Sequence, residues 1–359
     1  MPLFCYPFVQ ESFSMKTKNT VKPRLFAVLL ISVLLTLISG CQPVPNEVHL
    51  TGPTMGTTYN IKYWSETEQI PEDIQAKVDA ELVHINKLMS TYDPGSELSV
   101  FNQSKNTEPY SLSDETMLVM NEAINIAKMS NGYLDITVGP LVNLWGFGPQ
   151  AKPEVIPSDA EIVAIRAKVG FDKLTLSGNT VTRSHPEMYV DLSTVAKGYG
   201  VDRVAEIVES FGINNYLVEI GGEMRVAGEK LNGQQWRIAI EKPVTMERAV
   251  QEIISVGNNA IATSGDYRNY YEEEGVRYSH LIDPKTGKPI QHNLVSVTVV
   301  HPSCLIADGF STAIAVMGKE AGLEMALQNN LSVLLITREN GEFKEYTTPG
   351  FESFLINKG

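Results

Sequence analysis

Apolar residues recur at helical spacing in four separate parts of the chain. Over 72–89 and 113–130 they fall on one face, which predicts two amphipathic helices. Two more helices are predicted at 194–211 and 303–327. The last of these should break at Gly318, because glycine weakens a helix interior.

Short apolar stretches separated by turns predict strands in much of the remaining chain. Strands are expected within 48–64 and at 172–176, 180–183, 187–191, 215–220, 223–228, 235–241, 250–256, 278–282, 294–300, 331–337 and 343–347. Strands and helices are interspersed without a regular βαβ rhythm. We therefore expect an α+β fold in which mixed, mostly antiparallel sheets are flanked by helices. Residues 48–170 and 171–359 are expected to form two lobes with a ligand between them.

The N-terminus has the composition of a targeting segment. Four basic residues precede an apolar run of fourteen residues, 25–38, which is too short for a comfortable membrane span. The run ends in Ile-Ser-Gly-Cys41, which resembles a bacterial lipoprotein box with cleavage before the cysteine. A retained membrane anchor is the alternative. Met15 would place the basic residues closer to the start of the protein than Met1 does.

We therefore expect residues 1–40 to be a removed signal peptide, residues 41–47 a lipidated tether and residues 48–359 the folded domain. Cys41 would carry the lipid. Cys304 is then the one cysteine of the folded domain, so no internal disulfide is expected. Its apolar neighbours favour a core residue over a nucleophile.

The acidic composition argues against nucleic acid as a partner. The chain has 42 acidic and 29 basic residues, a formal charge of −13. Removal of residues 1–40 leaves 41 acidic and 25 basic residues, a formal charge of −16. Such a surface repels nucleic acid and anionic lipid headgroups. An anionic small molecule would need a locally favourable pocket or a metal ion.

The segment 191–202 has the pattern of a phosphate-binding helix start. A strand that ends at Asp191 leads through Ser193 into a new helix, whose first N–H groups lack intrahelical partners. The helix dipole adds partial positive charge there, and Lys197 adds a full charge one turn later. The alternative is an ordinary N-cap formed by Asp191 or Ser193.

A second helix start offers hard oxygen ligands. Asp308 and Thr312 are four residues apart and therefore lie on one helical face. Few protein carboxylates are needed for Mg²⁺, which keeps waters and also binds substrate phosphates. The alternative is again an N-cap, formed by Asp308. Two sites that prefer phosphate oxygen favour a diphosphate ligand.

These two segments and several other motifs together resemble the ApbE family, the FAD:protein FMN transferases of bacteria. The resemblance rests on Gly52-Pro-Thr-Met-Gly-Thr57, Met89-Ser-Thr-Tyr-Asp93, Tyr133-Leu-Asp-Ile-Thr-Val-Gly-Pro-Leu-Val142, Asp191-Leu-Ser-Thr-Val-Ala-Lys-Gly198, Glu219-Ile-Gly-Gly222, Ala262-Thr-Ser-Gly265, His280-Leu-Ile-Asp-Pro284 and Ala307-Asp308. The motifs cover essentially the whole mature chain. An ApbE-like fold, related to the T-fold, is implied.

The resemblance implies Mg²⁺-dependent transfer of the FMN moiety of FAD to a threonine or serine hydroxyl of a target protein, with release of AMP. By position, the FAD-lining residues would be Met55, Tyr92, Tyr133, Leu134, Asp135, Asp191, Lys197 and Ile282. Asp308 and Thr312 would bind Mg²⁺ together with an oxygen near Thr194.

The resemblance also implies the target proteins and the cellular location. The targets would carry a short threonine-containing motif, as in subunits of sodium-pumping NADH:quinone reductase. The enzyme would lie at the periplasmic face of the inner membrane, held by lipid (palmitate included) at Cys41.

A threonine hydroxyl is a weak nucleophile, so a base close to it helps the transfer. His280 is our candidate because it is close in sequence to Ile282, with Asp283 either orienting it or serving as the base. Two other functions stay open. One is an FAD pyrophosphatase that gives FMN and AMP, and the other is a lipid-anchored protein that binds FAD without catalysis.

Overall fold

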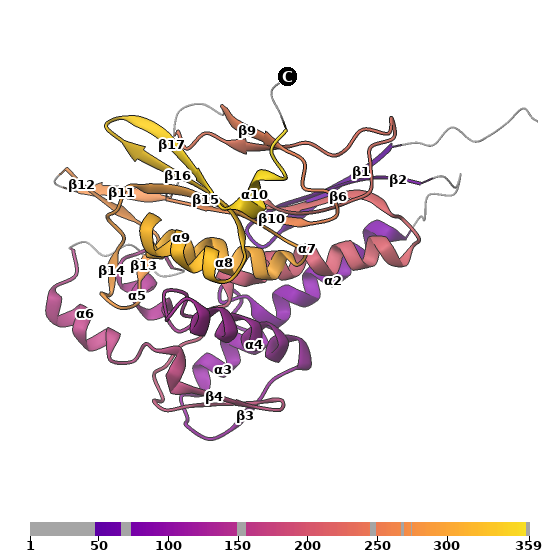
Figure 1. Ribbon diagram of the computed structural model, residues 1–359. Coiled ribbons are helices and arrows are strands. Elements are labelled where there is room, and N and C mark those ends of the chain that lie inside the picture. Colours follow the sequence, from indigo (N-terminus) through magenta and orange to yellow (C-terminus); the bar gives the residue numbers. More distant parts are fainter. Residues whose placement is uncertain are drawn as a thin grey trace, which may run out of the picture. The chain divides into compact units, whose positions relative to one another are not determined.

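Figure 1 shows the computed structural model, which describes residues 47–65, 73–148, 156–244, 249–266, 269–273 and 275–356. Contacts join these residues into one unit. Within these ranges, none of the helices combines the length and the apolar composition that a membrane crossing requires. The predicted signal peptide, Cys41 and all of the tether except Glu47 lie outside the described residues.

An eight-stranded antiparallel sheet organises the unit. Its strand order is β1-β2-β6-β7-β10-β15-β16-β17. The strands are β1 (Glu47–Thr54), β2 (Thr57–Trp64), β6 (Asn215–Ile220), β7 (Glu223–Ala227), β10 (Ala260–Gly265), β15 (Leu294–His301), β16 (Ser332–Glu339) and β17 (Glu342–Thr347). Because β2 pairs with β6, the sheet takes strands from both sides of residue 170. The predicted lobe boundary at 170 does not coincide with a break in this sheet.

Short sheets surround the central one. They are formed by β3 (Tyr110–Ser111) with β5 (Thr180–Arg183) and β4 (Leu174–Ser177), by β8 (Ile238–Glu241) with β9 (Val250–Ile254), by β11 (Tyr270–Glu273) with β12 (Val276–Ser279), and by β13 (Ile282–Asp283) with β14 (Lys288–Pro289). The described helices are α2 (Ile74–Met89), α3 (Glu97–Ser104), α4 (Asp114–Met129), α5 (Gly139–Leu144), α6 (Asp159–Arg166), the 3₁₀ turn η1 (Phe171–Lys173), α7 (Ser193–Ser210), α8 (Cys304–Met317), α9 (Lys319–Gln328) and α10 (Pro349–Glu352).

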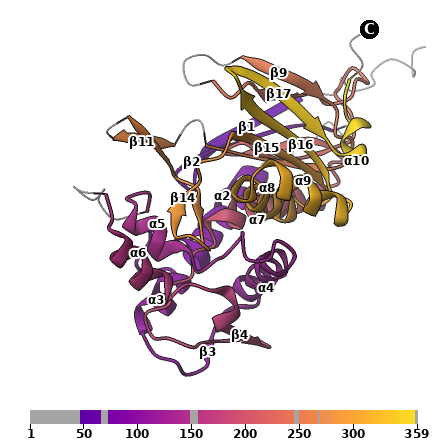
Figure 2. The same ribbon diagram turned by 60° about the vertical axis from the view of Figure 1, so that its left-hand side comes forward.

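Helices α7 and α8 pack side by side on one face of the central sheet, α7 against β6 and β7 and α8 against β10 and β15. Figure 2 shows α4 on the side of these helices that faces away from the sheet, where it contacts both. Nearly every residue of α8 is therefore buried. This explains why its sequence is apolar around the whole helix rather than along one stripe.

Most of the predicted elements are confirmed, with boundaries shifted by a few residues. The helix predicted at 303–327 breaks at Gly318, which separates α8 from α9. The strand predicted at 278–282 is divided between β12 and β13. Short elements were missed, among them α3, α5, α6, β10 and β11.

The strand predicted at 187–191 is wrong. The backbone N–H and carbonyl of Val190 bond to the side chain of Asn102 at 2.8 Å each, and the N–H of Asp191 donates to the carbonyl of Ile136 at 2.7 Å. Met188 and Val190 are buried, but a side chain and a loop, rather than a neighbouring strand, bond to the backbone of this segment.

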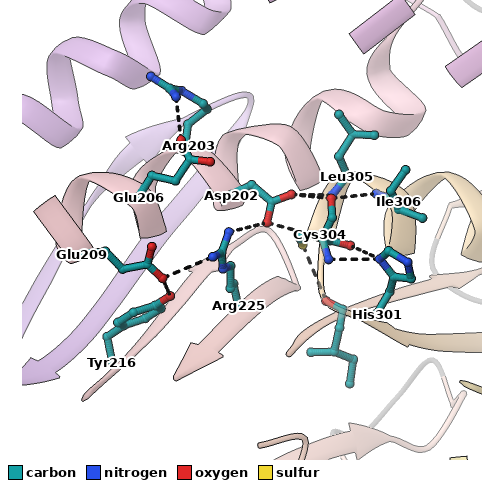
Figure 3. Close-up of polar contacts among 12 residues, drawn as sticks. Asp202, Arg203, Glu206, Glu209, Tyr216, Arg225, His301, Cys304, Leu305 and Ile306 are labelled. Atoms are coloured by element: carbon teal, nitrogen blue, oxygen red, sulfur yellow. Dashed lines mark hydrogen bonds and ion pairs between the residues drawn. The ribbon is translucent and has the colours of Figure 1, made fainter. Parts of the chain in front are cut away.

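Asp202 of α7 connects that helix to the start of α8 (Figure 3). Its carboxylate accepts the N–H groups of Cys304 at 3.0 Å and Leu305 at 3.1 Å, and the hydroxyl of Ser303 at 2.8 Å. Arg225 of β7 pairs with the same carboxylate at 3.2 Å. A residue of one helix therefore caps the N-terminus of another, where a negative charge is favourable.

We expect Asp202→Ala to lower the free energy of unfolding by about 3 kcal/mol, because the Arg225 guanidinium, two N–H groups of α8 and the Ser303 hydroxyl lose a buried acceptor. Urea denaturation followed by circular dichroism measures this. Glu206→Ala is the matched control on the same helix, since Glu206 makes an exposed pair with Arg203 that contributes no more than about 0.5 kcal/mol. Equal losses in the two variants would contradict the capping role.

Candidate active site

A cavity of about 390 Å³ lies beside the first turn of α7 and the middle of α8. It brings together most of the residues that the sequence singled out. Those that line it are Tyr133, Leu134, Asp135, Asp191, Thr194, Lys197, His280, Ile282, Asp308 and Thr312. Residues from four separate parts of the chain therefore meet at one place.

Three of the predicted site residues lie elsewhere. Met55 and Tyr92 line an adjoining cavity of about 560 Å³, which shares Ser193 and Lys197 with the first. Asp283 lines a third cavity of about 770 Å³, and its carboxylate accepts the N–H of Lys285 in a local turn.

The N-terminus of α7 is open to an anion. Leu192 is its N-cap residue and its apolar side chain accepts no hydrogen bond, so neither Asp191 nor Ser193 occupies the N-cap position. The Asp191 carboxylate accepts the N–H of Ser193, the first residue of α7, at 2.9 Å. Burial raises the pKa of Asp191. The start of α7 lines the cavity, where the helix dipole places partial positive charge.

Asp308 lies one turn inside α8 and does not cap it, because Ser303 accepts the N–H of Ile306 in that role. The Asp308 side chain is 4% exposed and accepts the N–H of Gly198 at 3.0 Å. Burial, reinforced by the charge of Glu223, raises the pKa of Asp308 to about 8. The α8 helix thus presents a buried carboxylate directly to the backbone of α7.

Hydroxyl groups line the same cavity as this carboxylate. Thr312, one turn after Asp308, contacts the Ser264 hydroxyl at 3.1 Å, and Ser264 also contacts Ser311 at 2.8 Å. The Thr194 hydroxyl is buried without a hydrogen-bond partner, although it lines the cavity. These oxygens and the Asp308 carboxylate are the hard donors that Mg²⁺ prefers.

The donor set fits Mg²⁺ better than a transition metal. Within the described ranges, no three His, Cys, Asp or Glu side chains form a cluster that could hold a metal ion. Zinc sites need such clusters, whereas Mg²⁺ is held by one or two carboxylates plus waters and substrate phosphates. One carboxylate with nearby hydroxyls therefore matches a magnesium site completed by a phosphate ligand.

Glu223 is a cavity residue that the sequence analysis missed. Its carboxylate, 4% exposed, forms an ion pair of 2.6 Å with Lys197, whose side chain is 32% exposed. Burial raises the pKa of Glu223, against the opposing charge of Lys197. The available signal was the position of Glu223 directly after Gly221-Gly222, at the start of a strand that enters the site.

His280 is held by a carbonyl rather than by Asp283. Its Nδ1 lies 3.0 Å from the carbonyl oxygen of Asn269, which can only accept, so Nδ1 carries the proton and Nε2 is left as the basic nitrogen. Burial lowers the pKa of His280, so the ring is neutral at neutral pH. The orienting contact predicted for Asp283 is therefore made by Asn269.

A row of aromatic rings ends at His280. Trp145, Tyr278, Tyr271 and Phe147 are stacked in succession with centroids 5.2–5.6 Å apart. The Phe147 ring meets the His280 ring edge-on at 6.4 Å. Trp145 and Phe147 directly follow α5, whereas Tyr271 and Tyr278 belong to β11 and β12. Phe147 lines the cavity, and the stacked rings support it from behind.

Asp135 holds the opposite loop together. Its carboxylate accepts the N–H and hydroxyl of Thr137 and the N–H of Phe171, so both oxygens are used by the protein. Next to it, the Tyr133 ring is covered by the ammonium of Lys285 at 3.8 Å from its centroid. Asp135 thus fixes the shape of the cavity lining, because both of its carboxylate oxygens bond to protein groups.

The chain matches known proteins over most of its length. A sequence model of the ApbE family matches residues 55–335. An FAD:protein FMN transferase of Vibrio cholerae is 53% identical over 333 residues, which cover 92% of this chain and 99% of the relative. An FAD:protein FMN transferase of Haemophilus influenzae is 44% identical over 346 residues, 94% of this chain and 100% of the relative.

Solved structures agree with the sequence matches. The flavin transferase ApbE of Vibrio cholerae superposes with a TM-score of 0.82 at 52% identity, over 87% of this chain and 100% of that chain. The apo form of the flavinyl transferase ApbE of Pseudomonas stutzeri gives a TM-score of 0.80 at 38% identity, over 87% and 97% of the two chains. The fold described above is thus shared with these proteins.

We expect His280 to titrate below its usual pKa of 6.5, because its burial penalises the charged ring. The folded state then binds this proton less readily than the unfolded state, so His280 should reduce stability as the pH falls below about 6.5. An NMR titration of labelled histidine, with His280→Gln used to assign the resonance, measures the midpoint. A midpoint above 6.5, or a proton on Nε2 in the neutral ring, would contradict the geometry.

Proposed function

The chain belongs to the ApbE family, and we propose that it is an FAD:protein FMN transferase. It would transfer the FMN moiety of FAD to a threonine or serine hydroxyl of a target protein through a phosphoester bond, with release of AMP. The observation that carries this proposal is one cavity that joins the start of α7, Lys197 and the buried Asp308 carboxylate. A diphosphate fits such a cavity, because the helix start and Lys197 supply positive charge and Asp308 belongs to a magnesium ligand set.

The two adjoining cavities suit the two halves of FAD. Ser193 and Lys197 line both cavities, so the diphosphate would lie at their junction, against the start of α7. One nucleotide half would occupy the cavity of Tyr133 and Ile282, and the other half the cavity of Met55 and Tyr92.

The chemistry would be a phosphoryl transfer at the FMN-side phosphorus. The acceptor hydroxyl oxygen forms the new bond to phosphorus, the bond to the bridging oxygen breaks, and AMP leaves with that oxygen. His280 Nε2 takes the proton from the hydroxyl, while Lys197 and the N–H groups of α7 hold the diphosphate oxygens. Asp308 and Thr312, with an oxygen at Thr194, would hold Mg²⁺, which when bound neutralises charge on the diphosphate.

An FAD pyrophosphatase would use the same groups, with water in place of the protein hydroxyl. A protein that only stores FAD is less compatible with the site, because a buried carboxylate beside a diphosphate position weakens binding unless a cation accompanies it. The relatives' names favour transfer over hydrolysis.

We also propose where the enzyme works. The lipoprotein box at Cys41 supports a lipid anchor on the periplasmic face of the inner membrane. The targets would be flavoprotein subunits with a threonine-containing motif, such as those of sodium-pumping NADH:quinone reductase.

Incubation of the purified protein with FAD, Mg²⁺ and a target that carries the threonine motif should increase the target's mass by one FMN moiety. Mass spectrometry of the target and chromatography of the nucleotides distinguish the three functions. FMN and AMP in solution with an unmodified target would indicate a hydrolase, and intact FAD a binding protein. Chelation of Mg²⁺ should abolish the reaction, whereas full activity in chelator would contradict the metal assignment.

His280→Ala should slow FMN transfer by about 100-fold or more, because the hydroxyl loses its base. Asp283→Ala is the matched control, since its carboxylate lies outside the cavity and should change the rate by less than about threefold. Single-turnover rates of target modification measure both. The reverse order of effects would assign the base to Asp283, and wild-type rates in both variants would remove His280 from the mechanism.

A further inference from the structure

Glu223 is a buried carboxylate of the cavity that has no role in the mechanism above. One of its oxygens, Oε1, pairs with Lys197, while Oε2 is buried and has no hydrogen-bond partner. Leaving a buried carboxylate oxygen without a partner costs free energy. The stability of the fold therefore does not explain why a charged residue occupies this position.

Two carboxylates compete for the ammonium group of Lys197. Burial alone would lower the pKa of Lys197, but the charges of Asp308 and Glu223 outweigh burial and raise it. The backbone of Lys197 is also next to Asp308, because Gly198 donates its N–H to that carboxylate. In the part of the chain that the structure describes, however, Lys197 forms an ion pair with Glu223 alone.

The β6–β7 turn holds this pair in place. Gly221 and Gly222 both have positive φ, 60° and 111°, which allows the tight turn that sets Glu223 at the start of β7. A Cβ on Gly221 would lie 3.5 Å from Cδ of Lys197 and 2.9 Å from Thr57. The lysine side chain thus runs closely past the turn to reach the carboxylate at its end.

We infer that Glu223 is a positioning residue that holds the Lys197 ammonium away from Asp308 and so keeps the Asp308 carboxylate available to a divalent cation. This inference rests on the proposed function, which supplies the cation. Without Glu223, Lys197 would pair with Asp308 and place its own positive charge where the cation is required. The same ion pair also leaves the lysine at the junction of the two cavities, where a diphosphate would lie.

A double-mutant cycle on metal binding tests the inference without FAD or target. The probe is Mn²⁺, titrated into the purified protein and followed by electron paramagnetic resonance of the free ion. We expect Glu223→Gln to weaken Mn²⁺ binding by about tenfold or more, and Lys197→Gln alone to change it by less than about threefold. The double variant should return to within about threefold of wild type, because the competing ammonium is gone.

An additive cycle would overturn the inference. If Glu223 acted only through its charge, Lys197→Gln alone would tighten Mn²⁺ binding as much as Glu223→Gln weakens it. Glu219→Gln is the matched control. It removes a carboxylate from the other end of the same turn, where the carboxylate binds Asn60 and the N–H of Gly222, and it should leave Mn²⁺ binding within about threefold.

Crystal structures show directly which carboxylate the lysine contacts, independently of metal affinity. Metal-free wild type should show Lys197 on Glu223, and Glu223→Gln should show it on Asp308. Lys197 on Asp308 in wild type, or no Mn²⁺ binding by wild type, would contradict the inference. The proposed function and this inference can be refuted separately. Wild type that binds Mn²⁺ but transfers no FMN refutes the function alone. Wild type that transfers FMN, with an additive cycle of Mn²⁺ binding, refutes the inference alone.

Discussion

The close packing of α7 against α8 is the constraint on which the rest of the candidate site depends. A Cβ at Gly198 would lie 2.4 Å from the carbonyl oxygen of Cys304, so only glycine lets the two backbones come this close. This approach allows the Gly198 N–H to reach the Asp308 carboxylate, and Asp202 fixes the same pair of helices one turn later. The helix start that faces an anion and the carboxylate that faces a cation are thereby held together.

Burial of the charged residues of the site costs the fold free energy. Asp308 and Glu223 are almost fully buried, and Lys197 has to balance both. An apolar cluster of the same volume would generally be at least as stable. Charges fixed in a water-poor cavity are useful where charge is transferred, because they need no reorganisation during the reaction. They also give an acidic protein a local place for an anionic ligand when a cation is bound.

The sequence predicts local structure correctly where a few consecutive residues determine it. Single residues decide the break at Gly318 and the start of α4, where the Ser113 side chain accepts the N–H of Thr116. Helix α6 carries a Ser158–Glu161 capping box that could have revealed it. The sequence also predicts Asp308 and Thr312 as cation ligands from local spacing, since four residues place both on one helical face. Glu223 was not predicted, because one carboxylate after two glycines is as compatible with a hairpin as with a site.

The sequence by itself determined most of the longer helices and strands, the two phosphate-preferring segments and the resemblance that connects them. These depend on side-chain periodicity, on local backbone geometry and on motif order, all of which follow from the order of the residues. Only the tertiary structure decided that Asn102 would satisfy Val190 from 88 residues away, that Asn269 would orient His280 in place of Asp283, and that Glu223 would hold Lys197. Such contacts join segments that meet only after the sheet has paired and the helices have packed, so nothing local specifies them.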